Sequence, residues 1–339
     1  MDETLTSARK ARRESIKGLF RFTIADSFDK ELVEDIVAAA PKVQVLTIEI
    51  LEGTTFDLSL LCDLKELLML KIMEGPFLQQ VTLEGIQEFD LLKGLEINVN
   101  PEKSIEELDL TPLAGHPELF SVTIACPTKS LKGLDALKTI PKLGSIGLYS
   151  LDIPELDLSA LSGCKGLTSI YLGDVDPETP TGPYRIILPR NIPLKVLEMS
   201  ECYSNDTVLE IDFSFMQDII AMDSLKLTDC NLTSFDLKVL SPLARIGRID
   251  LSENKISHLD ITPILEKPTF TEQALGEPAF VLDSDVIIQI DKKMENELPR
   301  ILKQPDKVID DHDGEFAIEY EFGHQWLQKL LDSHTVEWI

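Results

Sequence analysis

The chain has 339 residues, which is long for one compact domain and predicts either one elongated repeat domain or two globular ones. Hydrophobic residues make up 43% of it and charged residues 27%, so a soluble core is well supplied, and an aromatic content of only 6% predicts an aliphatic core. The formal net charge of −27 argues against nucleic acid binding, which needs clustered basic side chains. The one basic cluster is Lys10, Arg12 and Arg13 near the start.

Neither a signal peptide nor a membrane span is predicted. Residues 1–18 are polar, and no segment approaches the ~20 apolar residues that a membrane helix needs. The cysteines are odd in number and lack CxxC spacing, which favours reduced thiols over disulfides or a zinc site; they are Cys62, Cys126, Cys164, Cys202 and Cys230. These features together predict a cytoplasmic protein with no membrane partner.

Two helices are predicted before Val43. Residues 3–18 have the pattern of an exposed amphipathic helix, with Leu5 and Ile16 as apolar members. Residues 28–40 also have helical periodicity and lead directly into Val43. We therefore assign residues 1–42 to a helical N-terminal cap over the end of the core that follows.

A repeat occupies residues 43–264 and decides the fold class. An LxxLxL pattern with aliphatic substitutes recurs at nearly even intervals, starting at Val43, Leu67, Leu92, Leu119, Leu143, Leu167, Leu194, Met222 and Ile246. A second block, apolar–Asp–apolar–x–x–apolar, appears at 56–61, 108–113, 156–161, 211–216, 235–240 and 259–264. In five of these blocks the Asp stands at one fixed offset before the next LxxLxL start, so both motifs share one register.

The repeat resembles the leucine-rich-repeat family, whose signature is LxxLxLxxN/CxL. The best matches are MDSLKLTDCNL at 222–232 and IGRIDLSENKI at 246–256, and the resemblance covers about residues 43–264. It implies an α/β fold: a right-handed solenoid with parallel strands on its concave face. The ninth position of four repeats holds Asn100, Cys202, Cys230 and Asn254. The resemblance implies that these residues hydrogen-bond the backbone of the turn.

The spacing of the two blocks agrees with this fold. The fourth and sixth positions of LxxLxL share one face of a strand, and one repeat cannot cover that face alone, so neighbours must stack. The Asp blocks are predicted to be short extended segments on the convex side, each followed by a helical turn that Thr111 or Thr262 would cap. The Asp side chains support those turns or solvate the outer face; a ladder of cation sites is the alternative.

Residues 265–339 lose the repeat and are assigned to an α+β C-terminal cap or a small appended module. Residues 278–290 are predicted to be extended, 307–322 to form a hairpin with Asp313-Gly314 in its turn, and 324–334 to form a helix. An EF-hand around Gly314 is excluded, because Ile309 and Tyr320 would occupy its first and twelfth ligand positions. The histidines are interpreted as surface residues. No sequence motif indicates a catalytic residue, a metal or a cofactor.

The outward positions of the concave strands are the third, fifth and seventh of each repeat. In the three central repeats these carry only small residues and two tyrosines, Tyr149 and Tyr171. The last three repeats carry Glu198, Lys226, Arg248 and Asp250. Tyr and Arg are enriched in interface hot spots, so we predict that the tyrosines anchor a partner and that Lys226 and Arg248 contact its acidic groups. The alternative is that Ser, Thr and Tyr simply suit a strand.

The predicted function is that of a non-catalytic scaffold that binds another protein on the concave face, with no small-molecule substrate. A first alternative is a regulator of an enzyme, either a phosphatase-targeting subunit or a GTPase activator in which Arg248 would serve the phosphoryl transition state. A second is an enzyme whose chemistry lies in residues 265–339.

Overall fold

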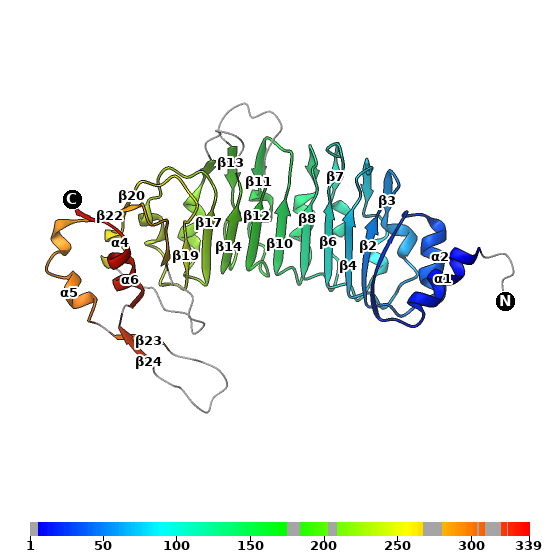
Figure 1. The fold of residues 1–339 in the computed structure, drawn as a ribbon, viewed down its shortest axis with the longest axis horizontal. Helices are drawn as coiled ribbons and strands as arrows, with labels where there is room; N and C mark the ends of the chain where they lie inside the picture. The colour runs from blue at the N-terminus through cyan, green and yellow to red at the C-terminus, as the bar shows by residue number, and fades with distance from the viewer. Residues whose placement is uncertain are drawn as a thin grey trace. The chain divides into compact units, whose positions relative to one another are not determined.

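The computed structural model describes residues 6–174, 184–202, 209–266, 280–303, 305–308, 320–323 and 325–339. The chain divides into two units, which we describe separately: Met1–Leu167 with Gly173–Thr179, and Thr168–Leu172 with Pro180–Ile339. In each unit, short strands alternate along the chain with short helices (Figure 1). Among the residues described, every helix is too short or too polar to span a lipid bilayer.

The first unit begins with α1 (Ser7–Ile16), β1 (Arg21–Asp26) and α2 (Lys30–Ala39). Both predicted helices are confirmed, but the strand between them was not predicted. It pairs in parallel with β2 (Val45–Ile50), with Phe22 opposite Leu46 and Ile24 opposite Ile48. Leu19, Phe22 and Ile24 are therefore the first, fourth and sixth positions of a further repeat, which precedes the repeat of Val43.

Two members of the predicted basic cluster, Arg12 and Arg13, are engaged with α2 together with Arg9, whereas Lys10 is exposed. Three guanidinium groups converge on the carboxylate of Asp35, whose side chain is fully buried. Arg9 Nη2 lies 2.9 Å from Asp35 Oδ1, Arg12 Nη1 lies 2.8 Å from Oδ2, and Arg13 Nε lies 2.7 Å from Oδ1. Burial alone would raise the pKa of Asp35, but the hydrogen bonds from Arg9 and Arg13 outweigh it and lower that pKa below its ordinary value.

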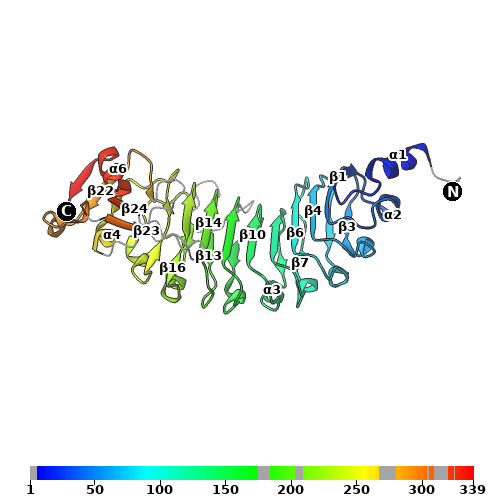
Figure 2. The same ribbon diagram turned by 90° about the horizontal axis from the view of Figure 1, so that it is seen from below.

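Each of the nine predicted LxxLxL segments forms a strand two or three residues after its first position. In the first unit these strands are β2, β4 (Met69–Glu74), β6 (Gly94–Val99), β8 (Ser121–Ala125) and β10 (Ser145–Tyr149), in parallel pairs in that order after β1. In the second unit they are β12 (Ser169–Gly173), β14 (Val196–Ser200), β17 (Ser224–Thr228) and β19 (Ile249–Asp250), followed by the added strand β21 (Phe280–Val281). In Figure 2 the strands β4 and β6 stand side by side, with β10 further along the same row.

Two backbone features repeat along these strands. At the strand entry, the carbonyl at the second position accepts two N–H groups from the next repeat, as Gln44 O does from Leu68 N at 2.8 Å and Met69 N at 3.0 Å. At the strand exit, six eighth-position residues have positive φ values of 48° to 67°: Glu74, Ser150, Asp174, Glu201, Asp229 and Glu253. This left-handed backbone costs an L residue roughly 1–2 kcal/mol, so the surrounding turn must hold it in place.

A second row of short strands lies at the Asp blocks. In the first unit β3 (Thr55–Asp57) pairs with β5 (Gln80–Thr82), β7 (Leu108–Asp109) pairs with β9 (Leu131–Lys132), and β11 (Glu155–Asp157) follows. In the second unit β13 (Tyr184–Ile187) pairs with β15 (Leu209–Ile211). The extended segments predicted for the Asp blocks are therefore confirmed for most of them. A separate pair, β16 (Ala221–Met222) with β18 (Arg245–Ile246), lies where two LxxLxL segments begin.

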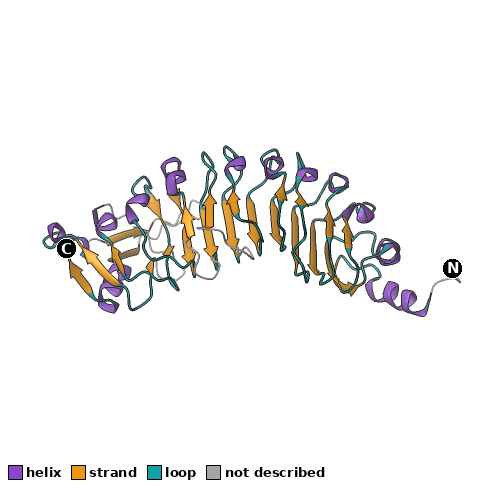
Figure 3. Ribbon diagram, turned by 90° about the horizontal axis from the view of Figure 1, so that it is seen from above, coloured by secondary structure: helices purple, strands orange, loops and turns teal. Residues whose placement is uncertain are grey.

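Short helices follow the Asp blocks, on the side away from the long strands in each unit (Figure 3). They are η1 (Leu58–Leu61), η2 (Ile86–Glu88), η3 (Thr111–Leu113), α3 (Leu134–Leu137), η4 (Ser159–Leu161), η5 (Phe213–Asp218), η6 (Leu237–Leu240) and α4 (Thr262–Glu266). In the Asp blocks the Asp, and not the Thr predicted earlier, bonds the first turn: Asp109 Oδ1 accepts from Thr111 N at 2.8 Å, and Asp260 Oδ1 from Thr262 N at 2.9 Å. The helices η2 and α3 instead follow a glycine and have no side-chain cap.

The same bond recurs in the other Asp blocks, from the N–H two residues after Asp57, Asp157, Asp212 and Asp236. Each carboxylate thus satisfies a backbone group of its own helix, which supports the turn interpretation over the cation ladder. In the part of the chain that the structure describes, no group of three or more His, Cys, Asp or Glu residues could hold a metal ion.

The C-terminal segment adds strands to the outer row. β20 (His258–Asp260), β22 (Ile287–Ile290) and β25 (Val336–Trp338) form a parallel sheet, and β23 (Pro305–Val308) pairs antiparallel with β24 (Tyr320–Gly323). The helices are η7 (Lys292–Met294), α5 (Leu298–Ile301) and α6 (Gln325–Ser333). The predicted helix and hairpin strands are confirmed; the Asp313-Gly314 turn lies outside the described residues. β25 was not predicted.

Candidate functional site

In the first unit, several large side chains along the long strands pack directly against the backbone of a glycine. Met69 Cε would lie 2.4 Å from a β-carbon placed on Gly94, and the ring of Phe120 would lie 2.3 Å from one on Gly144. Because glycine has no β-carbon, each large side chain can lie directly against the backbone of the next repeat. Phe120 nevertheless remains 54% exposed, at the entry edge of the strands.

Tyr149, one of the two predicted anchors, ends β10 and is half-buried. Its Cε2 atom would lie 2.9 Å from a β-carbon on Gly147, so the ring lies along the strand over that glycine. Any larger residue at position 147 would displace the ring. Tyr171, the second predicted anchor, lies in the middle of β12 and is also half-buried. The two tyrosines belong to different units, and each is described within its own.

The four predicted charged residues all lie on the strand face of the second unit, and the structure pairs them with one another. Glu198 and Lys226 are opposite each other on β14 and β17, with Lys226 Nζ 3.1 Å from Glu198 Oε1. Arg248 Nη2 lies 2.9 Å from Asp250 Oδ2, and Asp250 stands beside Lys226 in the register of β17 and β19. Any partner carboxylate must therefore compete with an ion pair that already exists.

Asp250 is the most enclosed member of this group, with only 6% of the residue exposed. Its Oδ1 atom accepts hydrogen bonds from Ser252 N at 3.2 Å and Ser252 Oγ at 2.6 Å, while Oδ2 faces Arg248. The side chains of Glu198 and Lys226 are each 32% exposed, so these two are the accessible members. The predicted contacts of Lys226 and Arg248 with a partner stay a prediction.

The first unit has an equivalent ion pair that sequence analysis missed. Lys71 and Glu96 occupy the fifth positions of adjacent repeats, and their side chains form an ion pair across β4 and β6. The signal was available, because opposite charges at equal positions of neighbouring repeats must face each other in a parallel register.

The ninth-position residues divide into those that bond the turn and one that does not. Asn254 Nδ2 donates to Leu227 O at 2.6 Å and Leu251 O at 2.9 Å, and its Oδ1 accepts from Cys230 N at 3.0 Å. The Sγ atoms of Cys202 and Cys230 donate to backbone carbonyls, so these two cysteines have the predicted role. Asn100 is exposed instead, because β6 continues to Val99 and that valine turns into the core.

The buried titratable groups show no sign of activation. Burial raises the pKa of Cys126 to about 12 and also raises that of Cys62, so both thiols are protonated near neutral pH. His116 was predicted to lie at the surface, but it is fully buried. Its Nε2 lies 3.2 Å from Phe89 O and its Nδ1 accepts from Leu119 N at 3.1 Å, and burial lowers its pKa.

Comparisons with known proteins find similarity only among solved structures; no protein-family model and no curated protein sequence matches the chain. An internalin, inlF of Listeria monocytogenes, is 14% identical over 80% of this chain and 84% of that one, with a TM-score of 0.35. The leucine-rich repeat domain of APL1B is 12% identical over the whole of both chains, with a TM-score of 0.40. The Toll–Spatzle complex of Drosophila gives 11% identity over 82% and 48%, with a TM-score of 0.32.

The architecture follows from the chain itself. Its repeat register, the parallel strand that each repeat contributes and the turn bonds of Asn254 make it a leucine-rich-repeat solenoid of the α/β class.

Proposed function

We propose that this protein is a non-catalytic interaction module that binds another protein on the face of its long strands. The observation that carries the proposal is the group of large side chains seated on glycines in the first unit: Met69 on Gly94, Phe120 on Gly144 and Tyr149 on Gly147. Such side chains offer a large contact area, and because they already lie against the backbone, a partner has less side-chain freedom to freeze.

The charged residues of the second unit would contribute specificity. Lys226 and Glu198 are partly exposed and form one ion pair, so a partner with a matching pair of charges could exchange with them at little net cost. The regulator alternative gains nothing from Arg248, because its guanidinium is bound to Asp250 and its side chain is only 18% exposed. None of the five cysteines, all of which lie among the described residues, is in a disulfide, and on that basis we propose a cytoplasmic location.

The test is affinity capture from native lysate with the intact chain, followed by a direct affinity measurement with each captured protein. The double variant Tyr149→Ala and Tyr171→Ala should lose the specific partner, with its Kd raised about tenfold or more, as expected for hot-spot tyrosines. Glu84→Ala, on an exposed turn away from the long strands, is the matched control and should bind normally. A partner bound equally by all three proteins would place the site elsewhere.

A further inference from the structure

The outer row of strands in the second unit is interrupted next to β15. Among the described Asp blocks, the one at 235–240 is the only block without a strand, although its sequence, FDLKVL, closely resembles FDLSLL at 56–61, which begins in β3. β15 pairs with β13 on one side, and the row resumes only at β20. The edge of β15 toward Phe235 is therefore unpaired. In the first unit the outer strands also fall into separate sheets, but there each block still contributes a strand.

A single departure from the repeat stands beside this gap. The residue after the block Asp is aliphatic and buried elsewhere, at Leu58, Leu110, Leu158, Leu237 and Ile261. In the block at 211–216 it is Phe213, which is too large for that position and stays half-buried. Its ring contacts Phe235 edge-on, with centroids 5.3 Å apart at 87°, and both aromatic side chains line the space between β15 and residues 232–236.

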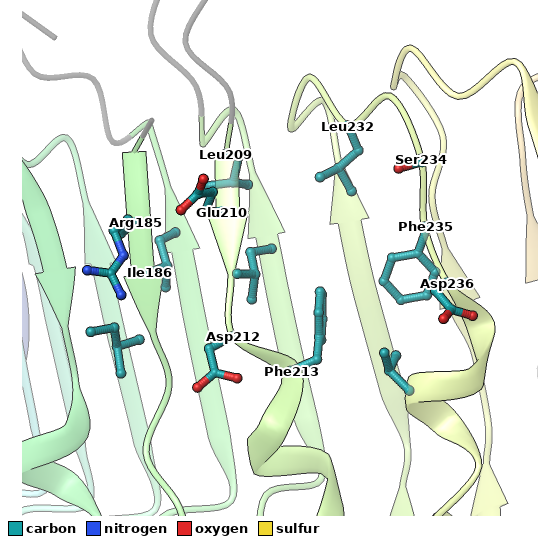
Figure 4. A pocket seen from close by; sticks show the side chains of 13 residues that line it. Arg185, Ile186, Leu209, Glu210, Asp212, Phe213, Leu232, Ser234, Phe235 and Asp236 are labelled. Atoms are coloured by element: carbon teal, nitrogen blue, oxygen red, sulfur yellow. The ribbon is translucent and has the colours of Figure 1, made fainter. Parts of the chain in front are cut away.

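A groove of about 500 Å³ lies at this gap (Figure 4). Its apolar lining includes Leu232, Val239 and the two phenylalanines, and its walls are β15 on one side and residues 232–236 on the other. A second recess of about 450 Å³ shares Phe213 and Val239 with it and continues between η5 and η6. The groove is thus open along a line rather than being an isolated pit.

One wall of the groove is an unpaired strand edge. Asp212 N donates to Ile186 O at 3.4 Å, so in this parallel pair Glu210 and Asp212 direct their backbone groups toward β13. Alternate residues of a strand point to opposite neighbours, and Ile211 therefore directs its N–H and its C=O into the groove. In the described residues, no backbone hydrogen bond joins β15 to residues 232–236.

The rim of the groove is acidic. Glu210, Asp212 and Asp236 border it, against the single guanidinium of Arg185. Arg185 stands opposite Glu210 in the register of β13 and β15, and both side chains are exposed. A strand added beyond β15 would therefore place an outward residue next to Glu210 on the side away from Arg185, where a basic side chain fits best.

We propose that this groove binds an extended segment of a partner protein as an added β-strand, with apolar side chains turned inward and Lys or Arg turned outward. Main-chain hydrogen bonds to Ile211 provide affinity, and the apolar lining and the acidic rim select the sequence. The site lies among the outer strands, so it is separate from the face in the proposed function, and either one can fail without the other.

The probe is a fluorescein-labelled peptide of four Lys-Val repeats, titrated by anisotropy against the full-length protein. Two further versions of the peptide are methylated on the backbone nitrogen, one at every lysine and the other at every valine. Each version therefore lacks the N–H donors along one of the two edges of the bound peptide strand. The peptide should bind, and one of the two methylated versions should bind about tenfold more weakly or worse. Equal binding of both would show mere attraction to an acidic protein and overturn the proposal, as would no binding at all.

The matched variants are Phe213→Leu and Phe120→Leu. The first restores the aliphatic residue of the other blocks, should close the groove, and is expected to weaken peptide binding about tenfold or more while leaving the fold intact. The second makes the same change on the strand face of the first unit and should leave binding unchanged.

Glu210→Lys should lower affinity for the Lys-Val peptide and raise it for a Glu-Val peptide. Sedimentation equilibrium completes the set: a dimer that Phe213→Leu dissolves would assign the groove to a second copy of the chain and overturn a partner peptide. The Tyr149 and Tyr171 double variant should bind the peptide normally.

Discussion

Replacing Asn254 by alanine should remove the strongest side-chain link between adjacent turns of the second unit. Asn254 joins two adjacent repeats: it donates to Leu227 O and Leu251 O and accepts from Cys230 N and Leu232 N, at distances of 2.6, 2.9, 3.0 and 3.1 Å. These partners are backbone groups, which alanine cannot satisfy. The left-handed turn at Glu253, with φ of 61°, directly precedes it.

The cost follows from those four bonds. A net contribution of about 1 kcal/mol for each, with some water entering the partly buried site, gives a loss of about 3–4 kcal/mol in the free energy of unfolding. For a unit of this size that is a fall in Tm of about 10 °C. Asn254→Cys should lose less, about 2–3 kcal/mol, because a thiol can still donate one bond, as Cys230 Sγ does to Met199 O.

The assay is urea unfolding followed by tryptophan fluorescence. The only two tryptophans, Trp326 and Trp338, both lie in the second unit, so the signal reports on the unit that contains Asn254. Asn100→Ala is the matched control, because it makes the same change at the same repeat position where the side chain is exposed. Asn100 lies in the first unit, so both variants are also followed by far-UV circular dichroism, and the control should cost less than about 0.5 kcal/mol. Equal costs for the two variants would refute the account of the ninth position.

Two further predictions concern buried titratable side chains. Asp35→Asn should lower the free energy of local unfolding of α1 by about 3 kcal/mol or more, since three arginines lose their carboxylate partner. Trypsin should then cleave after Arg9. The control is Glu31→Gln, which removes an exposed ion pair of 3.9 Å with Arg9 and should leave the cleavage rate unchanged. His116 has a pKa lowered by burial, so its stabilisation is complete above the unfolded pKa of about 6.5 and is lost as the pH falls below it. The difference in unfolding free energy between wild type and His116→Asn should shrink from pH 8 to pH 5, and a constant difference would contradict a neutral, buried imidazole.

The strands were predictable because the repeat is periodic and every strand obeys the same steric rule. Nine starting positions read from the sequence all precede strands. The tenth, at Leu19, was missed because Phe22 replaces an aliphatic residue and no Asp block precedes it, although its distance from Val43 equals that from Val43 to Leu67. β25 was missed for a different reason: its partner β22 lies far back along the chain, and nothing local marks that pairing.

Side-chain partners were harder to predict than strands. The pattern correctly placed Glu198, Lys226, Arg248 and Asp250 on one face, but their pairing was not predicted, although Glu198, Lys226 and Asp250 share the fifth position of neighbouring repeats. That outcome depends on the lateral register of neighbouring strands, which fixes Lys226 between Glu198 and Asp250. His116 follows the same logic, because its burial depends on Phe89 in the preceding repeat offering a carbonyl.

Departures from a repeat carry more functional information than the repeat does. The aliphatic residues that follow the block Asp residues are interchangeable, because each of them fills the equivalent interior space of its own repeat. Phe213 differs from them: it stays half-buried and contacts Phe235 edge-on beside the unpaired edge of β15. An unpaired edge invites association with other strands, so a repeat protein gains by removing it unless the edge is used. We expect Phe213→Leu to remove it here, so the presence of phenylalanine at this position favours a ligand for this edge.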